Sequence, residues 1–184
     1  MLRNTIESWG TPAKLLHWIM AALVLAQFAL GWTAANWRLS PLKLELFVWH
    51  KSVGMLVLGL LMLRILWRMA NPTPAMPADA PVWERHAARV SHVLLYLLLI
   101  AMPISGWIVN SAANIPFSIF WLIPLPAIVE PAEETADLAK WAHLALFVAL
   151  SAMLVVHMGA ALRHHYINRN DVLARMLPGG RRRA

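Results

Sequence analysis

Two histidines, His143 and His157, lie fourteen residues apart in one long apolar run, and imidazoles are strong ligands for metals and haem iron. In an α-helix, fourteen residues bring the second side chain back to within ~40° of the first and ~21 Å further along the axis. One face of one membrane-crossing helix would then present an imidazole near each membrane surface. His17 and His50 lie near the starts of two other apolar runs. Four imidazoles in two pairs indicate two bis-histidine haems stacked across a membrane.

The composition favours a membrane protein over a soluble one. The chain has 184 residues, of which 60% are hydrophobic and only 14% are charged. Its net charge of +7 comes from basic residues that gather beside the apolar runs, so we expect membrane lipid as the partner and no nucleic acid. The chain has no cysteine, which excludes disulfides, iron–sulfur clusters and covalently attached haem. Any haem must be bound non-covalently.

Four apolar segments are long enough to cross a hydrocarbon core, which requires ~20 helical residues. They cover about residues 15–35, 47–67, 90–110 and 142–162. The sequence therefore predicts an all-α integral membrane protein, in which residues 1–184 form one domain, a four-helix bundle with two haems in its core. The first segment is too long for a signal peptide and lacks a small-residue cleavage pattern, so we expect it in the mature protein.

The distribution of positive charge predicts the orientation. Lysines and arginines concentrate before the first segment, between the second and third, and after the fourth: Arg3, Lys14, Arg64, Arg68, Arg85, Arg89, Arg163, Arg169, Arg175 and Arg181–Arg183. The other two connections are poorer in cations, and one of them contains Glu130, Glu133, Glu134 and Asp137. Because positively charged loops stay in the cytoplasm, we expect both termini there, in a multi-pass protein of the bacterial inner membrane.

Two connections are rich in proline. Residues 71–81 should be extended, since proline cannot continue a helix. Residues 115–129 are apolar but are interrupted by Pro116, Pro124 and Pro126, which makes the stretch too short and too broken to span a membrane. We expect an interfacial or re-entrant segment on the outer side, covering a cofactor or lining a quinone cleft. A second candidate quinone site lies near His92 and Arg89 on the inner side.

Depth in the membrane decides which histidines can form pairs. His17 and His157 both lie near the cytoplasmic face, and His50 and His143 both lie near the outer face, so each pair can hold one haem iron. A histidine inside a membrane segment is costly unless it has a partner, which makes all four functional candidates. The alternative is that they are interfacial histidines bonded to the backbone or to lipid headgroups.

Other histidines have different expected roles. His92 has a depth comparable with that of His17 and could replace it as a ligand, although a contact with a haem propionate or a role in quinone binding fits it better. His86 should face solvent. His164 and His165 follow Arg163 at the inner surface, where we expect contacts with headgroups or propionates.

Glycines near the candidate ligands support a cofactor. Gly54 follows His50 by four residues on the same helix face, where a missing side chain would let a flat macrocycle approach. Gly31, Gly106 and Gly159 could serve in the same way. Close packing between helices is the alternative explanation, because small residues are favoured at helix contacts in membranes.

Several short motifs, in this order and spacing, resemble those of the bacterial cytochrome b561 family, and the resemblance extends over nearly the whole chain. They are His17-Trp18, the HKSxG-like string His50–Gly54, Arg64 and Arg68 before Pro72-Thr73-Pro74, Trp141–Leu144, and Leu162-Arg163-His164-His165-Tyr166 followed by Asp171, Arg175-Met176 and Pro178. The resemblance implies a four-helix di-haem protein of the inner membrane. It also implies that His17, His50, His143 and His157 are the axial ligands, in the pairing that depth predicts.

The same resemblance implies a function. One type in this family is a superoxide:ubiquinone oxidoreductase, which would make the chain an enzyme with two non-covalent b-type haems and ubiquinone as electron acceptor. Relatives also include the haem-bearing subunits of nickel–iron hydrogenases and formate dehydrogenases. The resemblance does not fix the electron donor.

Three hypotheses follow. In the first, electrons pass from a donor on the periplasmic side, with superoxide as a candidate, to membrane ubiquinone. Lys51 and Lys140 are the nearest outer-side cations that could attract this anion, whereas the acidic run from Glu130 would oppose it. In the second, the chain is a haem-bearing anchor and electron relay for a separate redox enzyme. The third is a haem-free transporter or scaffold, which predicts colourless protein; the chain shows neither the repeated halves nor the broken helices of transporters.

Overall fold

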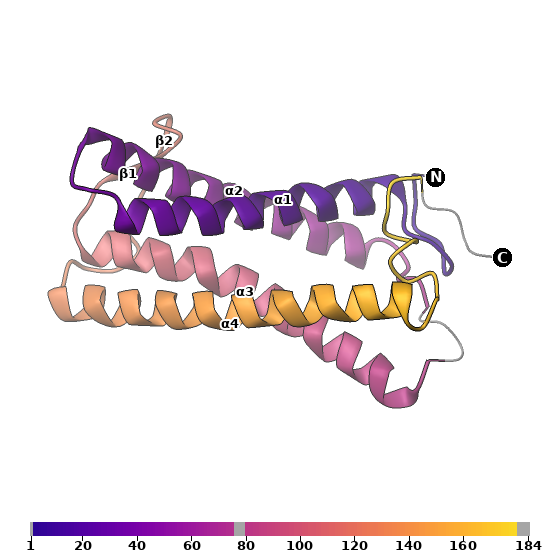
Figure 1. The fold of residues 1–184 in the computed structure, drawn as a ribbon. Helices are drawn as coiled ribbons and strands as arrows, with labels where there is room; N and C mark the ends of the chain where they lie inside the picture. Colours follow the sequence, from indigo (N-terminus) through magenta and orange to yellow (C-terminus); the bar gives the residue numbers. More distant parts are fainter. Residues whose placement is uncertain (1, 76–79, 180–184) are drawn as a thin grey trace.

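The computed structural model describes residues 2–75 and 80–179, and its main elements are four long helices (Figure 1). The helices are α1 (Thr11–Asn36), α2 (Pro41–Met69), α3 (Val82–Ala112) and α4 (Glu133–Tyr166), and two short strands, β1 (Phe117–Ile119) and β2 (Ile123–Leu125), lie between α3 and α4. The arginine run 181–183 and residues 76–79 of the proline-rich connection lie outside the described residues.

Each helix is long and apolar enough to cross a membrane, and each contains one of the four apolar segments. A helix satisfies its backbone hydrogen bonds internally, which is what a hydrocarbon environment requires. Local signals begin the first two helices: Pro12 and Pro41 lie in their first turns, and the Ser40 side chain accepts a hydrogen bond from the backbone of Lys43. The predicted fold class, an integral membrane four-helix bundle, is confirmed.

The bundle consists of two helical hairpins. α1 packs mainly on α2, α3 packs mainly on α4, and α2 joins the two hairpins through α3. The N-terminal and C-terminal segments and the α2–α3 connection lie at one end of the bundle, here the termini end. The α1–α2 and α3–α4 connections lie at the opposite end, here the hairpin end.

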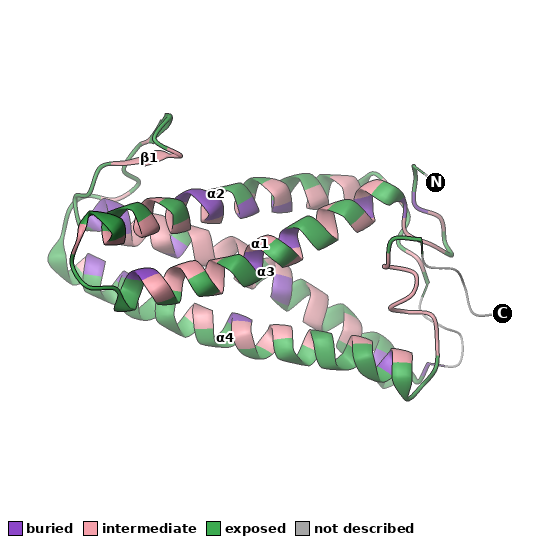
Figure 2. Ribbon diagram, turned by 45° about the horizontal axis from the view of Figure 1, so that its top comes forward, coloured by how far each residue is buried: buried purple, intermediate pink, exposed green. Residues whose placement is uncertain are grey.

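The tightly packed core is small. Its buried centre comprises Met20, Val24, Val53, Val57 and Leu61, from α1 and α2. Most other helical surface is exposed or half-buried (Figure 2). An apolar exterior is expected for a protein whose solvent is lipid, and buried alanines such as Ala34 and Ala139 permit close contacts where helices meet.

The proline-broken stretch 115–129 contains a β-hairpin that its sequence did not predict. β1 and β2 pair antiparallel, with Phe117 opposite Leu125 and Ile119 opposite Ile123. A two-stranded ribbon tolerates Pro124 because a strand at an edge can lack one N–H donor. The stretch does not cross the bundle, and β1 packs against α2.

The tip of this hairpin is strained and anchored. Phe120 and Trp121 have φ values of 47° and 61°, a region that costs bulky residues ~1–3 kcal/mol each. The Phe120 backbone N–H donates to Ser52 Oγ on α2 at 2.8 Å. The Trp49 ring lies 5.7 Å from that of Phe120 and 5.6 Å from that of Trp121. These contacts hold the aromatic tip against α2. The α2 residues that make them, Trp49 and Ser52, are close to His50 in the sequence.

The termini end is closed by contacts between segments far apart in the chain. Trp18 Nε1 donates to the carbonyl of Met176 at 2.8 Å, and Lys14 Nζ donates to that of Leu177 at 3.1 Å. Arg175 donates to the carbonyl of Ala75 at 2.8 Å. The residues after α4 therefore fold back over the start of α1.

A buried carboxylate links α3 to α4 at this end. Glu84 is 6% exposed, and its Oε1 accepts from Arg163 NH1 at 2.8 Å. His164 is also buried; its Nε2 lies 3.9 Å from Glu84 Oε2, and its Nδ1 lies 2.9 Å from the amide nitrogen of Asn170. The expected contact of His164 with lipid headgroups does not fit its burial against the first turn of α3, whereas the alternative contact with a propionate stays a prediction.

Arg163→Ala should destabilise the protein, because it leaves the buried Glu84 carboxylate without its strongest partner. We expect a loss of ~1–3 kcal/mol, seen as a lower thermal midpoint of the detergent-solubilised protein. Lys140→Ala is the control, since Lys140 and Asp137 form an exposed pair at 2.8 Å and such pairs contribute ~0–1 kcal/mol. Equal shifts in the two variants would contradict a special role for the buried link.

Candidate functional site

The four predicted ligands meet in two pairs. At the termini end, the ring centroids of His17 on α1 and His157 on α4 lie 6.3 Å apart, with the planes at 68°. At the hairpin end, the centroids of His50 on α2 and His143 on α4 lie 6.4 Å apart, with the planes at 83°. These are here called the termini-end pair and the hairpin-end pair. The pairing expected from membrane depth agrees with these contacts.

The separation of the rings suits a shared metal atom. Metal–imidazole bonds are ~2 Å long, so two imidazoles on opposite sides of one metal have centroids ~6 Å apart. A direct N–H···N bond of ~3 Å would bring the centroids to ~5 Å. Both pairs have the wider spacing. Among the described residues, no group of three or more His, Asp or Glu side chains could hold a metal ion without a macrocycle.

A hydrogen bond from α3 orients His143. Ser105 Oγ donates to the carbonyl of Met102 at 2.8 Å and lies 2.8 Å from His143 Nδ1. When its one proton is donated to the Met102 carbonyl, the Ser105 hydroxyl accepts a hydrogen bond from an N–H at Nδ1 of His143. The other ring nitrogen, Nε2, is then unprotonated and available as a ligand. The sequence analysis did not identify Ser105, although a serine on the facing helix is the kind of residue that fixes a ligand's tautomer.

Glycines make room for the imidazoles themselves. A Cβ on Gly31 would lie 2.9 Å from Cε1 of His50, and one on Gly106 would lie 3.3 Å from Cε1 of His143. His50 Nδ1 is buried against α1 without a hydrogen-bond partner among the described residues. These two glycines therefore make room for the rings of the hairpin-end pair, and the expected room for a macrocycle stays a prediction.

The other two glycines behave differently. A Cβ on Gly54 would meet Gln27 Nε2 at 3.0 Å, and this amide donates to the carbonyl of His50 at 2.7 Å. The alternative of close helix packing therefore holds for Gly54. Gly159 is exposed, and a Cβ there would have no neighbour within 4 Å among the described residues.

Two further groups surround the termini-end pair. His92 on α3 lies with its ring centroid 5.5 Å from that of His157. Arg64 on α2 donates to the carbonyl of Ala13 at 3.3 Å and to the Tyr96 hydroxyl at 3.4 Å, and the Arg68 guanidinium lies 5.7 Å from the Tyr96 ring centroid. Cations at this end suit the carboxylates of a haem, which bidentate arginines bind well. His86 is exposed, as expected.

The two outer-side cations named above differ in their surroundings. Lys51 is half-buried; it donates to Asn110 Oδ1 and lies 5.5 Å from the Phe117 ring centroid. No carboxylate lies within ion-pair distance of it in the part of the chain that the structure describes. Lys140 is exposed and paired with Asp137. Of these two lysines, Lys51 is therefore the one whose positive charge is not balanced by a neighbouring carboxylate.

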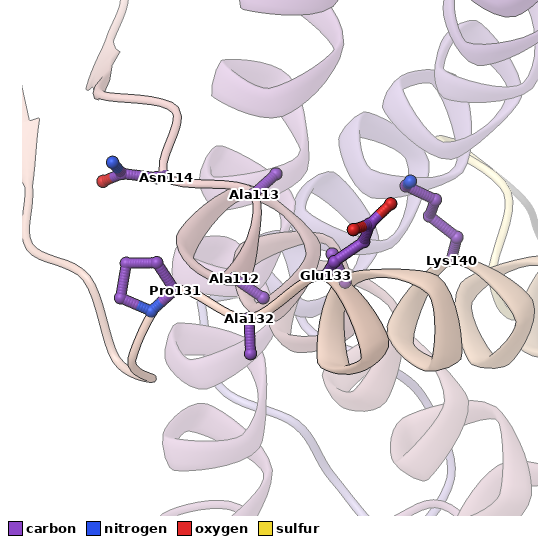
Figure 3. Close-up of a pocket in the computed structure, with 8 residues that line it drawn as sticks. Ala112, Ala113, Asn114, Pro131, Ala132, Glu133 and Lys140 are labelled. Atoms are coloured by element: carbon purple, nitrogen blue, oxygen red, sulfur yellow. The ribbon is translucent and has the colours of Figure 1, made fainter.

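A hollow of about 390 Å³ lies at the hairpin end, between the end of α3 and the start of α4 (Figure 3). Residues lining it include Ala112, Asn114, Glu133 and Lys140. None of the four candidate ligands lines it, and it is open to the surroundings. It is separate from the histidine pairs.

Comparison with known proteins decides the family. Residues 8–179 match the family described as prokaryotic cytochrome b561. The chain belongs to this family. Membership means that it is a multi-pass membrane protein of electron transfer that binds b-type haem, and the histidine pairs are donor sets suited to that group.

Curated relatives agree with this membership. The chain is 37% identical to cytochrome b561 homolog 2 of Escherichia coli over 181 residues, which cover 95% of this chain and 93% of that protein. It is 28% identical to cytochrome b561 homolog 1 of the same organism, over 89% of this chain and 93% of that one. It is 32% identical to a probable superoxide oxidase CybB of Yersinia pestis, over 89% of this chain and 92% of the relative.

Gly31→Ala should lower the haem content, because the new methyl group would displace the His50 imidazole from its seat. Gly106→Ala should lower it less, since its contact is longer by 0.4 Å (3.3 against 2.9 Å). Gly59→Ala is the control: Gly59 is exposed, and a Cβ there has no neighbour within 4 Å among the residues that the structure describes. Haem per chain measured by pyridine haemochrome checks the order. Full haem in Gly31→Ala would show that the seat is not needed.

Proposed function

We propose that this chain holds two b-type haems, one between His17 and His157 and one between His50 and His143. The observation that carries the proposal is the spacing of the two ring pairs, 6.3 and 6.4 Å, at opposite ends of the bundle. When bound, such haems supply reversible one-electron transfer at iron. The protein's own part is to fix the imidazoles, to present unprotonated nitrogens and to exclude water.

We further propose that the chain moves electrons between a donor on the periplasmic side and ubiquinone in the inner membrane, with both termini in the cytoplasm. Two imidazoles per iron leave no open position for oxygen, which favours electron transfer over oxygen activation. The positions of Lys and Arg support the orientation, because the connections at the termini end hold most of them. The hairpin end would then face the periplasm.

The donor we propose is superoxide, as the name of the Yersinia pestis relative suggests. Two superoxide anions would each lose one electron and leave as dioxygen, and ubiquinone would take up the two electrons and two protons to become ubiquinol. Lys51 supports this choice, because a half-buried ammonium without an acidic partner attracts an anion more strongly than a solvated one. Glu130, Glu133 and Glu134 oppose it less than their number suggests, since they are exposed and screened by water and salt.

Loss of a ligand on α4 should remove one haem and leave the other. His143→Ala should lose the haem of the hairpin-end pair, and His157→Ala that of the termini-end pair, so that each variant retains about half of the haem. The measurement is haem per chain, together with the reduced-minus-oxidised spectrum. His86→Ala, at an exposed position on α3, should retain both. Retention of both haems in either α4 variant would refute the ligand assignment.

Lys51→Gln should slow the reduction of ubiquinone by superoxide and weaken its dependence on ionic strength, because the anion loses electrostatic guidance. We expect a fall of up to about tenfold in the second-order rate constant, whereas Lys51→Arg, which retains the charge, should stay close to the wild type. Lys140→Gln should have no effect, because the charge of Lys140 is already balanced by Asp137.

Haem content is measured in each of these variants, so that loss of haem is not mistaken for loss of the electrostatic attraction of superoxide. Wild-type protein with both haems but no superoxide-dependent reduction of ubiquinone would refute the donor. That result would favour the relay role beside a separate redox enzyme.

A further inference from the structure

α3 carries none of the proposed ligands, yet it faces both of the ligands on α4. α3 and α4 are antiparallel and cross each other, and contacts join them at several levels. Ser105 lies opposite His143 and His92 lies opposite His157. The separation of the two α3 residues, thirteen positions, nearly equals the fourteen positions that separate the ligands. Each ligand on α4 thus has a polar neighbour from α3 at its own level.

At the hairpin end the contact is a hydrogen bond. The Ser105 hydroxyl accepts a hydrogen bond from Nδ1–H of His143 and donates one to the carbonyl of Met102. This arrangement holds the ring in one tautomer and in one orientation. A histidine ligand whose second nitrogen donates a hydrogen bond is also a stronger electron donor to its metal.

At the termini end His92 lies beside His157, with no hydrogen bond between the two rings in the part of the chain that the structure describes. Its ring centroid is 5.5 Å from that of His157, closer than the rings of either ligand pair. Two imidazoles joined by an N–H···N bond of ~3 Å have centroids ~5 Å apart, so the observed value lies within ~0.5 Å of a hydrogen-bonded pair. The spacing of His17 and His157, in contrast, fits two ligands of one metal.

We propose that His92 is the positioning residue for His157, as Ser105 is for His143. In this proposal, α3 orients both of the proposed ligands on α4. His92 would accept a hydrogen bond from Nδ1–H of His157, which would leave Nε2 of His157 free to face His17. The inference rests on the proposed haem ligation. It assigns His92 a role other than that of an alternative ligand.

An imidazole is a better hydrogen-bond acceptor than a serine hydroxyl. His157 should therefore be the more electron-donating of the two α4 ligands, which favours the oxidised iron at the termini end. Removing the acceptor should raise the midpoint potential of that haem alone. Removing the Ser105 hydroxyl should raise the potential of the other haem alone.

The test is a redox titration of the purified wild type and of His92→Leu, His92→Gln, Ser105→Ala and Ser105→Thr, with low-temperature EPR of the two ferric signals. We expect His92→Leu to retain both haems, to raise one potential and to shift one EPR signal, namely those lost in His157→Ala. Ser105→Ala should shift the other set. His92→Gln and Ser105→Thr each retain an acceptor and should remain closer to the wild type.

Two results would overturn the inference. Loss of the termini-end haem in both His92→Leu and His92→Gln, with His17→Ala retaining it, would make His92 the ligand. Unchanged potentials and EPR signals in His92→Leu, with both haems present, would show that His92 does not act on His157. If His92→Leu cannot be purified, His92→Gln decides: a small shift in the potential and EPR signal of the termini-end haem supports the inference, and no shift overturns it. Wild-type protein without haem would instead refute the proposed function itself.

Discussion

The distance between facing imidazoles is the constraint on which the rest of this bundle depends. In both pairs the ring centroids are held slightly more than 6 Å apart, too far for a direct hydrogen bond and suitable for a metal atom between them. Each pair joins the α1–α2 hairpin to α4, so the separation of those two units must be fixed to within a fraction of an ångström. Small changes matter, because one methyl group on Gly31 would already collide with a ring.

The four helices divide this task. α4 provides a proposed ligand at each level because fourteen residues return a helix to nearly the same face. α1 and α2 provide one proposed ligand each, and contacts from α1 position the His50 ring, with the Gln27 amide bonded to the backbone carbonyl of His50 and Gly31 beside its imidazole. α3 contributes neighbours for the ligands of α4. Helices gain little from hydrophobic association in lipid, so small residues and polar contacts such as these must hold them in register.

The two ends of the bundle differ in their electrostatics and in their covers. At the hairpin end, the half-buried Lys51 lies under an aromatic β-hairpin whose strained tip is bonded to α2. At the termini end, the chain folds back over the start of α1, Arg64 and Arg68 lie near Tyr96, and the buried Glu84 ties α3 to α4. This asymmetry suits a protein that would receive an anion on one side of a membrane and is anchored by charge on the other.

The sequence by itself determined the four helices, their apolar exterior and the two levels at which histidines lie, because hydropathy and the helical period are properties of each segment alone. Only the tertiary structure decided what lies opposite each residue: Ser105 beside His143, Gly31 and Gly106 beside imidazoles, and Glu84 against His164. It also decided that residues 117–125 form a hairpin, since proline spacing marks only where a helix cannot continue. These contacts depend on the rotation and axial register of one helix against the next, which arise from packing among all four helices.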